Sequence, residues 1–522
     1  MKKYLSIVKK ELLFQFIFEI LAILAIARIP YMEKLLVDNF IEKSSNSILE
    51  IIILVILFIL IYSLCSWISA RFMIIRINKM RDSIQKDLFS SLTHITKQKF
   101  AEKNIGEYIT MQNKDIAIIV GDYFQPLIDL IRNILEIIIY AATIAIYIDW
   151  KISILLISSS MIICIVPKFF ESKLSHKRSN QILNQGKYAT LVQDHLNGIT
   201  LIDSITRKNI TYLHHKSSKT MNNSIYNFEF FKSISQLACN FAIKLLDMIV
   251  FIIIGISLIK NIITAGTALA IFSYTHCLMS PFKNFLYDIN AIQSSKAIKN
   301  RFIKNLNIQN NKKIIKKSFN KSINFSSTNI CYSDFSINNF NFSFNAKNKY
   351  IITGHSGCGK STLLRLLANE ITPDEGNVFI DNQNINELNT DNVLCFLHQN
   401  EHIYKANFQD NVTMFGSYSN DKYLDAIKLL ESNILNKIKN TADCSSLSGG
   451  EKQIVAFMRA LTSNKDIILL DEPFSALDQR NKSHMMTIVK NLKDKTIIMV
   501  SHDMKSKDES LFINQLYVDH NY

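Results

Sequence analysis

The stretch Gly354-His355-Ser356-Gly357-Cys358-Gly359-Lys360-Ser361-Thr362 decides the fold of the C-terminal half of this 522-residue chain. It follows an apolar run at 350–352 and precedes a leucine-rich run that is typical of a helix. A glycine-rich loop between a strand and a helix turns its backbone N–H groups toward phosphate oxygens. Lys360 adds a positive charge for the β- and γ-phosphates, and the Ser361 hydroxyl is suited to bind Mg²⁺. The pattern predicts a P-loop site that takes ATP.

Further motifs accompany this loop in a fixed order. They are Phe-Leu-His-Gln at 396–399, Leu-Ser-Gly-Gly-Glu at 447–451, an apolar strand ending in Asp-Glu at 471–472, Ser-Ala-Leu-Asp at 475–478, and a second apolar strand ending in Ser-His-Asp at 501–503. The series resembles the nucleotide-binding domain of ABC transporters over residues 323–510. The Leu-Ser-Gly-Gly-Glu signature is more diagnostic than the phosphate loop, which many NTPases share.

The resemblance implies a role for each acid and for the histidine that end these strands. Asp471 is at the carboxyl end of its strand, where ligands of α/β sheets bind, and resembles the family's Mg²⁺-organising acid. Glu472 resembles the general base that polarises the attacking water. His502 resembles the switch histidine that contacts the γ-phosphate. Phosphoryl transfer depends on positioning and charge neutralisation, so a metal, a base and several donors suffice.

Two residues outside these strand ends complete the expected ATP site. Gln399 resembles the glutamine that senses Mg²⁺ and faces the membrane domain. Tyr332 resembles the aromatic residue that stacks on adenine, although most of the nearby phenylalanines are expected in the core.

The signature implies that the chain acts with a second copy of its ATP-binding domain. Ser448, Gly449, Gly450 and Glu451 begin a helix, so their N–H groups form a second phosphate-facing terminus. The resemblance implies that they face ATP held by another domain's phosphate loop. One chain carries one half of each site, so we expect a homodimer or a heterodimer of half-transporters.

Residues 1–300 are expected to form a membrane domain. A hydrocarbon core of about 30 Å needs roughly 20 helical residues. Six apolar runs meet this length, at 13–36, 49–71, 128–148, 152–170, 236–258 and 265–286. The polar stretches between them, 71–125 and 170–235, are patterned as helices, which matches the exporter-type membrane domain. Short helices near 112–119 and 202–210 are expected to contact the ATP-binding domain.

Charge placement predicts the orientation of these spans. Lysine and arginine gather at the N-terminus and in the two long polar stretches, whereas the remaining loops carry few of them. The positive-inside rule then places both chain ends in the cytoplasm, in a bacterial cytoplasmic membrane. The net charge of +15 is explained by contact with anionic headgroups of the bilayer, so no nucleic acid is expected as a partner.

The predicted fold class is an all-α six-helix transmembrane domain of ABC exporter type, followed by an α/β P-loop NTPase domain with an ABC signature subdomain. The expected boundaries are 1–300 for the membrane domain, 301–322 for a basic linker and 323–522 for the ATP-binding domain. The eight cysteines show no metal-ligand spacing and are expected to be reduced. Ionisable residues within the spans are expected to pair internally or to contact substrate.

The function implied is ATP-driven export of a peptide, a lipid or a hydrophobic small molecule, with ATP and Mg²⁺ bound. Three alternatives stay open at this point. They are an importer on the exporter-type fold, a membrane regulator that uses ATP but transports nothing, and a soluble ABC ATPase, which the six apolar runs disfavour.

Overall fold

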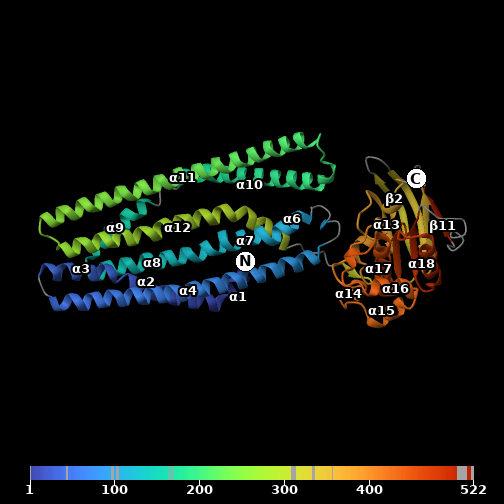
Figure 1. The fold of residues 1–522 in the computed structure, drawn as a ribbon, viewed down its shortest axis with the longest axis horizontal. Coiled ribbons are helices and arrows are strands. Elements are labelled where there is room, and N and C mark those ends of the chain that lie inside the picture. Colours follow the sequence, from blue (N-terminus) through green and yellow to red (C-terminus); the bar gives the residue numbers. More distant parts are fainter. Residues whose placement is uncertain are drawn as a thin grey trace. The chain divides into compact units, whose positions relative to one another are not determined.

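The computed structural model describes residues 2–42, 45–95, 99–100, 105–163, 166, 168–306, 313–331, 336–355, 357–501 and 514–518. The chain folds into two compact units (Figure 1). The helical unit is Met1–His94 with Lys103–Ile308, and the other unit includes Gln309–Tyr522.

The helical unit consists of long helices that pack along one another. They are α1 (Lys2–Ile7), α2 (Lys9–Ile26), α3 (Ile29–Ile41), α4 (Ser45–Thr93), α6 (Ile105–Thr110), α7 (Ile116–Ile118), α8 (Gln125–Tyr147), α9 (Trp150–Ile163), α10 (Lys168–Asn197), α11 (Arg207–Ile259) and α12 (Ala265–Leu306). At 1.5 Å per residue, the 53 residues of α11 extend about 80 Å, well beyond a hydrocarbon core of about 30 Å. This confirms that the polar stretches continue as helices. Figure 1 shows α10 and α11 as one paired hairpin.

The first predicted span is broken in the middle. The helix stops after α2, and Pro30 stands at the beginning of α3, where a residue without an N–H is tolerated. The carbonyl of Ala27 at this break accepts a hydrogen bond from the hydroxyl of Tyr274, 2.8 Å away on α12. The carbonyl of Ala27 is buried at this break, and the hydrogen bond from Tyr274 satisfies it.

Neither of the two short helices expected to contact the ATP-binding domain is a separate element. Residues 112–119 belong to one helical stretch, Ile105–Tyr147, with π-helical turns η1 (Met111–Asp115) and η2 (Ile119–Phe124) on either side of α7. Residues 202–210 follow the 3₁₀ turn η3 (Ile199–Leu201), pass through a turn stabilised by the side chain of Asp203, and enter α11. The predicted ends of the first short helix fall inside a continuous helical stretch. The second predicted helix begins in a turn and runs on into α11.

Within the described residues, four helical stretches are long and apolar enough to cross a membrane: Lys9–Ile41, Ile48–Thr93, Ile105–Tyr147 and Arg207–Ile259. Of the other two predicted spans, 152–170 runs across residues outside the described part of the chain. The last, 265–286, is the beginning of α12, where Thr275, His276 and Pro281 interrupt the apolar run. The number six therefore stays a prediction.

The C-terminal unit contains three sheets among its described residues. A five-stranded parallel sheet has the order β11 (Asn514–Val518), β4 (Lys349–Gly354), β10 (Thr496–Val500), β9 (Ile467–Asp471) and β8 (Leu394–Leu397). An antiparallel sheet has the order β3 (Ser336–Asn345), β2 (Ser322–Cys331), β5 (Glu375–Ile380) and β6 (Gln383–Asn384). β1 (Ile314–Ile315) pairs with β7 (Leu388–Asn389). Every residue of β9 and β10 is buried, as expected for a parallel sheet covered on both faces.

Helices cover this sheet and complete the unit. They are α13 (Lys360–Leu367), α14 (Phe408–Thr413), α15 (Asn420–Ile427), α16 (Ser432–Lys439), α17 (Gly449–Thr462) and α18 (Gln479–Asn491), with 3₁₀ turns η4 (Ile385–Glu387) and η5 (Cys444–Ser446). Of the residues expected as a linker, 301–306 belong to α12 and 314–315 form β1.

Candidate nucleotide-binding site

Four of the predicted ATP-site segments come at or just after the ends of parallel strands of one sheet, so they meet at one edge. β10 is flanked by β4 and β9, and β8 lies beyond β9. Val500 is paired with Ile352 on one side and with Asp471 on the other. The carboxyl ends of such strands form the ligand-binding edge of α/β sheets. The phosphate loop, the acidic pair, Gln399 and Ser501 therefore leave the sheet at the same edge.

The phosphate loop has a backbone that requires glycine at its start. Gly354 has φ of +149°, and a Cβ there would lie 2.1 Å from the carbonyl oxygen of Val518 on β11. Gly359 has φ of +95° and is the residue that precedes α13. The loop thus turns sharply into the N-terminus of α13, whose unpaired N–H groups favour an anion.

Lys360 is buried beneath this loop. Its ammonium donates to the carbonyl of Gly354 at 3.0 Å and to that of His355 at 2.6 Å. The side chain is therefore held at the centre of the loop, with the thiol of buried Cys358 3.7 Å away. Of the other predicted loop residues, Thr362 lies in the first turn of α13, and Ser356 is outside the described residues.

Ser361 and Asp471 form the pair expected to hold Mg²⁺. The Ser361 hydroxyl donates to a carboxylate oxygen of Asp471 at 3.0 Å. Burial raises the pKa of Asp471 and outweighs the lowering effect of the Ser361 hydrogen bond. A buried carboxylate beside a hydroxyl is an oxygen donor set of the kind that Mg²⁺ prefers, and a bound cation would stabilise the ionised acid. The residues present therefore fit the metal.

Glu472 leaves the strand in the left-handed backbone region, with φ of +48°. Its amide donates to the carbonyl of Val500 at 3.1 Å, which fixes the turn. Its carboxylate accepts a hydrogen bond from the side-chain amide of Gln399 at 2.8 Å. The structure thus places Gln399 against the predicted base, whereas Asp471 has Ser361 as its hydrogen-bond partner.

The signature residues begin α17 with a complete capping box. The Ser448 hydroxyl accepts from the Glu451 amide, and the Glu451 carboxylate accepts from the Ser448 amide at 3.0 Å. Glu451 also pairs with Lys437 of α16 at 2.6 Å. The hydrogen bond from Lys437, followed by that from Ser448, holds the pKa of Glu451 below its usual range. The carboxylate of Glu451 thus has a structural partner on each side.

The two signature glycines differ in their surroundings. A Cβ at Gly449 would make an ordinary contact, 3.7 Å from the Ala476 side chain. A Cβ at Gly450 would lie 2.7 Å from the Ala476 carbonyl oxygen. Gly450 is therefore the position at which α17 approaches the segment 475–478 most closely.

Sequence reasoning missed Gln453, which joins these two motifs. Its side-chain amide donates to the Ser475 hydroxyl at 3.1 Å and accepts from the Ala476 amide at 3.0 Å. The spacing of Gln453 could have indicated this role. It is four residues after Gly449 and three after Gly450, so it lies on the same face of α17.

The predicted site residues Tyr332 and His502, like Ser356, lie outside the described residues. The strand that leads to His502 ends with Val500. Among the described residues, no group of three or more His, Cys, Asp or Glu side chains could hold a metal ion. A magnesium ion here would therefore depend on Ser361, Asp471 and nucleotide oxygens.

Three charged residues in the predicted spans have polar partners inside the helical unit. Lys244 pairs with Asp247 at 3.0 Å. Glu19 accepts from Gln15 and Ser69, at 3.0 and 3.2 Å. These contacts support internal pairing at these positions.

Two family models match this chain, one for each unit. One described as "ABC transporter transmembrane region" matches residues 12–282, which is more than half of the chain. One described as "ABC transporter" matches residues 337–475.

Similar proteins divide by how much of the chain they cover. The ATP-dependent lipid A-core flippase of Haemophilus influenzae is 22% identical over 94% of this chain and 88% of its own length. The nitrate import ATP-binding protein NrtD of Synechococcus elongatus is 32% identical over only 31% of this chain and 61% of its own length. A solved bacterial Atm1-family ABC exporter with ATP bound matches 95% of this chain and 91% of its own, with a TM-score of 0.81 and 17% identity.

Proposed function

This chain belongs to the ABC transporter family as an exporter-type half-transporter, and from that premise we propose that two such chains export an amphipathic substrate from the cytoplasm. The ATP-binding domain is an ATPase coupled to transport. The proposal adds the direction, the pairing of two chains and the class of substrate, which is a lipid, a peptide or a hydrophobic small molecule.

The observation that carries the export direction is which relatives match the membrane region. The lipid flippase matches 94% of the chain and therefore includes the membrane region, whereas the nitrate import ATP-binding protein matches only 31% of the chain. Direction is a property of the membrane region, because the ATPase is shared by importers and exporters. An importer on this fold and a regulator that transports nothing are the alternatives that the experiment below separates.

The residues of the ATP site have distinct roles in this proposal. Lys360 and the N-terminus of α13 bind the β- and γ-phosphates. Ser361 and Asp471 would hold Mg²⁺, which neutralises phosphate charge when bound. Glu472 accepts a proton from the attacking water, while Gln399 holds its carboxylate in position. His502 would contact the γ-phosphate, and Tyr332 would stack on the adenine.

Two chains are needed because each supplies half of each ATP site. The N-terminus of α17 carries Ser448, Gly449 and Gly450, and the Ser448 side chain caps it. Like the N-terminus of α13, it has backbone N–H groups without a partner inside the helix. In the proposed dimer this terminus binds the γ-phosphate of ATP held by the other chain. A homodimer is the simplest assembly, and a heterodimer with a related half-transporter is the alternative.

The membrane orientation follows from the distribution of basic residues. Both chain ends and both long helical extensions would lie in the cytoplasm, where ATP is available. ATP binding would bring the paired ATP-binding domains together, and hydrolysis would release them. The long helices would transmit this movement to the membrane spans.

The test measures ATP-driven movement of two named probes in proteoliposomes. The probes are phosphatidylglycerol and a hydrophobic peptide, each with a fluorescent label that a membrane-impermeant reductant quenches. We expect ATP added outside to move a probe away from the leaflet that faces the ATP-binding domains. Glu472→Gln should abolish this movement, whereas Glu387→Gln, an exposed glutamate on η4, should not.

Two other outcomes would each support one of the alternative functions. Movement toward the ATP-binding side would establish an importer. ATP hydrolysis without movement of either probe would favour the regulator and would overturn the proposal for these two classes of substrate.

A further inference from the structure

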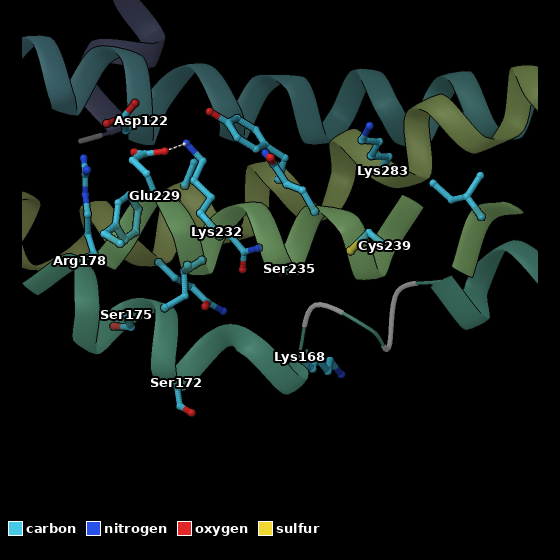
Figure 2. A pocket seen from close by; sticks show the side chains of 18 residues that line it. Asp122, Lys168, Ser172, Ser175, Arg178, Glu229, Lys232, Ser235, Cys239 and Lys283 are labelled. Atoms are coloured by element: carbon cyan, nitrogen blue, oxygen red, sulfur yellow. Dashed lines mark hydrogen bonds and ion pairs between the residues drawn. The ribbon is translucent and has the colours of Figure 1, made fainter. Parts of the chain in front are cut away.

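A large cavity lies inside the helical unit, between α10, α11 and α12 (Figure 2). Its volume is about 610 Å³, which is in the range that binds small ligands. η2 contributes Asp122 at one end, beside Arg178 of α10 and Glu229 of α11, as Figure 2 shows. Lys283 of α12 and Cys239 of α11 lie toward the other end.

The charges around this cavity are mostly positive. Its described lining holds four cationic and two acidic side chains: Lys168, Arg178, Lys232, Lys283, Asp122 and Glu229. Glu229 is paired with Lys232 at 3.3 Å. Arg178 lies beside Asp122 at one end of the cavity. The described lining thus carries an excess of two positive charges.

Two of the cations are positioned by neutral partners. The Arg178 guanidinium stacks over the ring of buried Phe228, 5.0 Å from its centre, and donates to Gln181 at 2.9 Å. The Lys283 ammonium donates to the side-chain oxygen of Asn240 at 3.4 Å. Neutral partners orient these side chains, and the excess of positive charge in the lining makes an anion the expected ligand.

The cavity also lies where three helices change from apolar to polar sequence. α11 is rich in charged and polar residues before Gln236 and largely apolar after it, apart from Asn240, Lys244 and Asp247. α12 is largely apolar up to Phe282 and becomes polar from Lys283 onward. α10 begins with Lys168, next to the apolar α9. In a membrane this change marks the level of the lipid headgroups.

Ile243, on the apolar part of α11, lines the cavity on its membrane side, whereas Leu174 and Phe228 line it along the polar parts of α10 and α11. The cavity therefore combines cations near headgroup level, Lys168 and Lys283, with an apolar side chain toward the hydrocarbon region. We propose that it binds the anionic headgroup of an amphiphile that the transporter takes from the cytoplasmic leaflet. This inference rests on the proposed function, because it names the class of substrate for that export.

The test uses Cys239, a natural thiol inside the cavity. Its side chain is partly exposed, so a maleimide can reach it. The purified full chain is placed in nanodiscs of phosphatidylcholine, with or without phosphatidylglycerol. The rate of Cys239 alkylation is followed by mass spectrometry of its peptide, with exposed Cys331 in the other unit as the reference thiol.

We expect phosphatidylglycerol to slow Cys239 alkylation by about tenfold, as for a site with ligand at about ten times its Kd, without slowing Cys331. The double variant Arg178→Gln/Lys283→Gln should lose this protection. A matched control, Arg207→Gln/Lys219→Gln, removes the same two charges from exposed positions of α11 and should keep it. Equal alkylation rates in the two nanodiscs would overturn the proposal, as would protection that survives in the cavity variant.

Two further arms identify the source of the anion. Inorganic phosphate added to phosphatidylcholine nanodiscs should not slow Cys239 alkylation. Protection of Cys239 by phosphate alone would overturn the proposal that the ligand is an amphiphile. Glu472→Gln should show normal protection, which Mg²⁺ and ATP should remove if the bound amphiphile is the one transported. Protection that persists with ATP would indicate a resident lipid and overturn the assignment as substrate.

The two proposals fail in different ways. If Cys239 is protected but no probe moves in proteoliposomes, the binding site stands and export of these probes fails. If a probe moves but Cys239 is not protected, export stands and this cavity is not its site.

Discussion

Ser361 and Asp471 are separated by 110 residues, yet the Ser361 hydroxyl donates a hydrogen bond to the Asp471 carboxylate at 3.0 Å. Ser361 is in the first turn of α13, and Asp471 is the last residue of β9. The two elements pack against each other because β9 is in the same sheet as β4, one strand away. This contact joins the phosphate loop to the acidic pair that would complete the metal site.

Ser361→Ala should raise the Mg²⁺ concentration needed for half-maximal ATPase activity by about tenfold or more. Loss of a group that hydrogen-bonds to a metal ligand typically lowers metal affinity by at least that factor. Removing the hydroxyl takes away both an expected ligand and the hydrogen bond that orients Asp471. Ser361→Thr keeps the hydroxyl and should stay close to the original chain. The measurement is a Mg²⁺ titration of ATPase activity at saturating ATP. An unchanged titration in Ser361→Ala would remove Ser361 from the metal site.

Glu472→Gln should keep ATP binding and lower turnover by about 100-fold or more, as for loss of a general base. The amide group of glutamine can still bond Gln399, so the turn and its hydrogen bond remain. Binding is followed with a fluorescent ATP analogue, and turnover by phosphate release. Glu387→Gln serves as the control for a lost exposed carboxylate. Robust hydrolysis in Glu472→Gln would place the base elsewhere.

Much of the ATP site was predictable from sequence because the phosphate loop, Gln399 and the acidic pair each come at or just after the end of a strand. In a parallel sheet, residues that follow neighbouring strands necessarily meet at one edge, so Asp471, Glu472 and the phosphate loop could be grouped without a structure. The partner of Gln399 could not be predicted. That contact depends on the left-handed backbone of Glu472, which turns its carboxylate toward β8, and no sequence pattern marks this conformation.

The helical unit shows a different limit of sequence reasoning. Apolar runs predicted where helices would lie, because hydrophobicity alone decides that a segment can span a membrane. They did not predict the π-helical turns before α8 or the break at Ala27, where the Tyr274 hydroxyl of distant α12 donates to the Ala27 carbonyl. The cavity was also beyond prediction, because its cations come from three helices distant in sequence.

Gly450→Ala should destabilise the ATP-binding domain, whereas Gly449→Ala should not. The new Cβ at 450 must displace the Ala476 backbone, and overpacking of this kind costs about 1–3 kcal/mol. The Cβ at 449 makes an ordinary contact with the Ala476 side chain, and alanine is favoured over glycine in a helix by up to about 1 kcal/mol. Thermal unfolding of the full chain should therefore rank Gly449→Ala above Gly450→Ala. The reverse order would contradict the close approach at Ala476.

Glu451 should make the stability of the ATP-binding domain depend on pH only under acidic conditions. Its pKa is lowered from 4.5 by Lys437 and then by Ser448, so the ionised carboxylate stabilises the folded state. That contribution is fully present above the unfolded pKa and is lost as pH falls through the lower, folded value. The pair is exposed at Lys437, so we expect only about 0.5 kcal/mol.

Glu451→Gln is the variant that checks this pH dependence, because glutamine keeps the capping box but has no charge. The difference in unfolding temperature between the two chains should be constant from about pH 8 to pH 5 and should shrink below about pH 4.5. A difference that grows as pH falls would contradict the sign of the shift. High salt should reduce the difference at neutral pH, because exposed ion pairs are screened.

Gln453→Ala should uncouple ATP binding from hydrolysis without unfolding the domain. Gln453 holds the segment 475–478 against α17 through two hydrogen bonds, and neither partner belongs to the phosphate loop. ATP affinity should therefore change little, whereas turnover should fall by about tenfold as the segment loses its position. Gln453→Glu keeps the acceptor for the Ala476 amide and loses only the donor to Ser475, so its turnover should be intermediate. A structural defect alone would lower affinity and turnover together in both variants. If turnover in Gln453→Ala equals that of the original chain, the contact between α17 and the segment 475–478 does not position the ATP site.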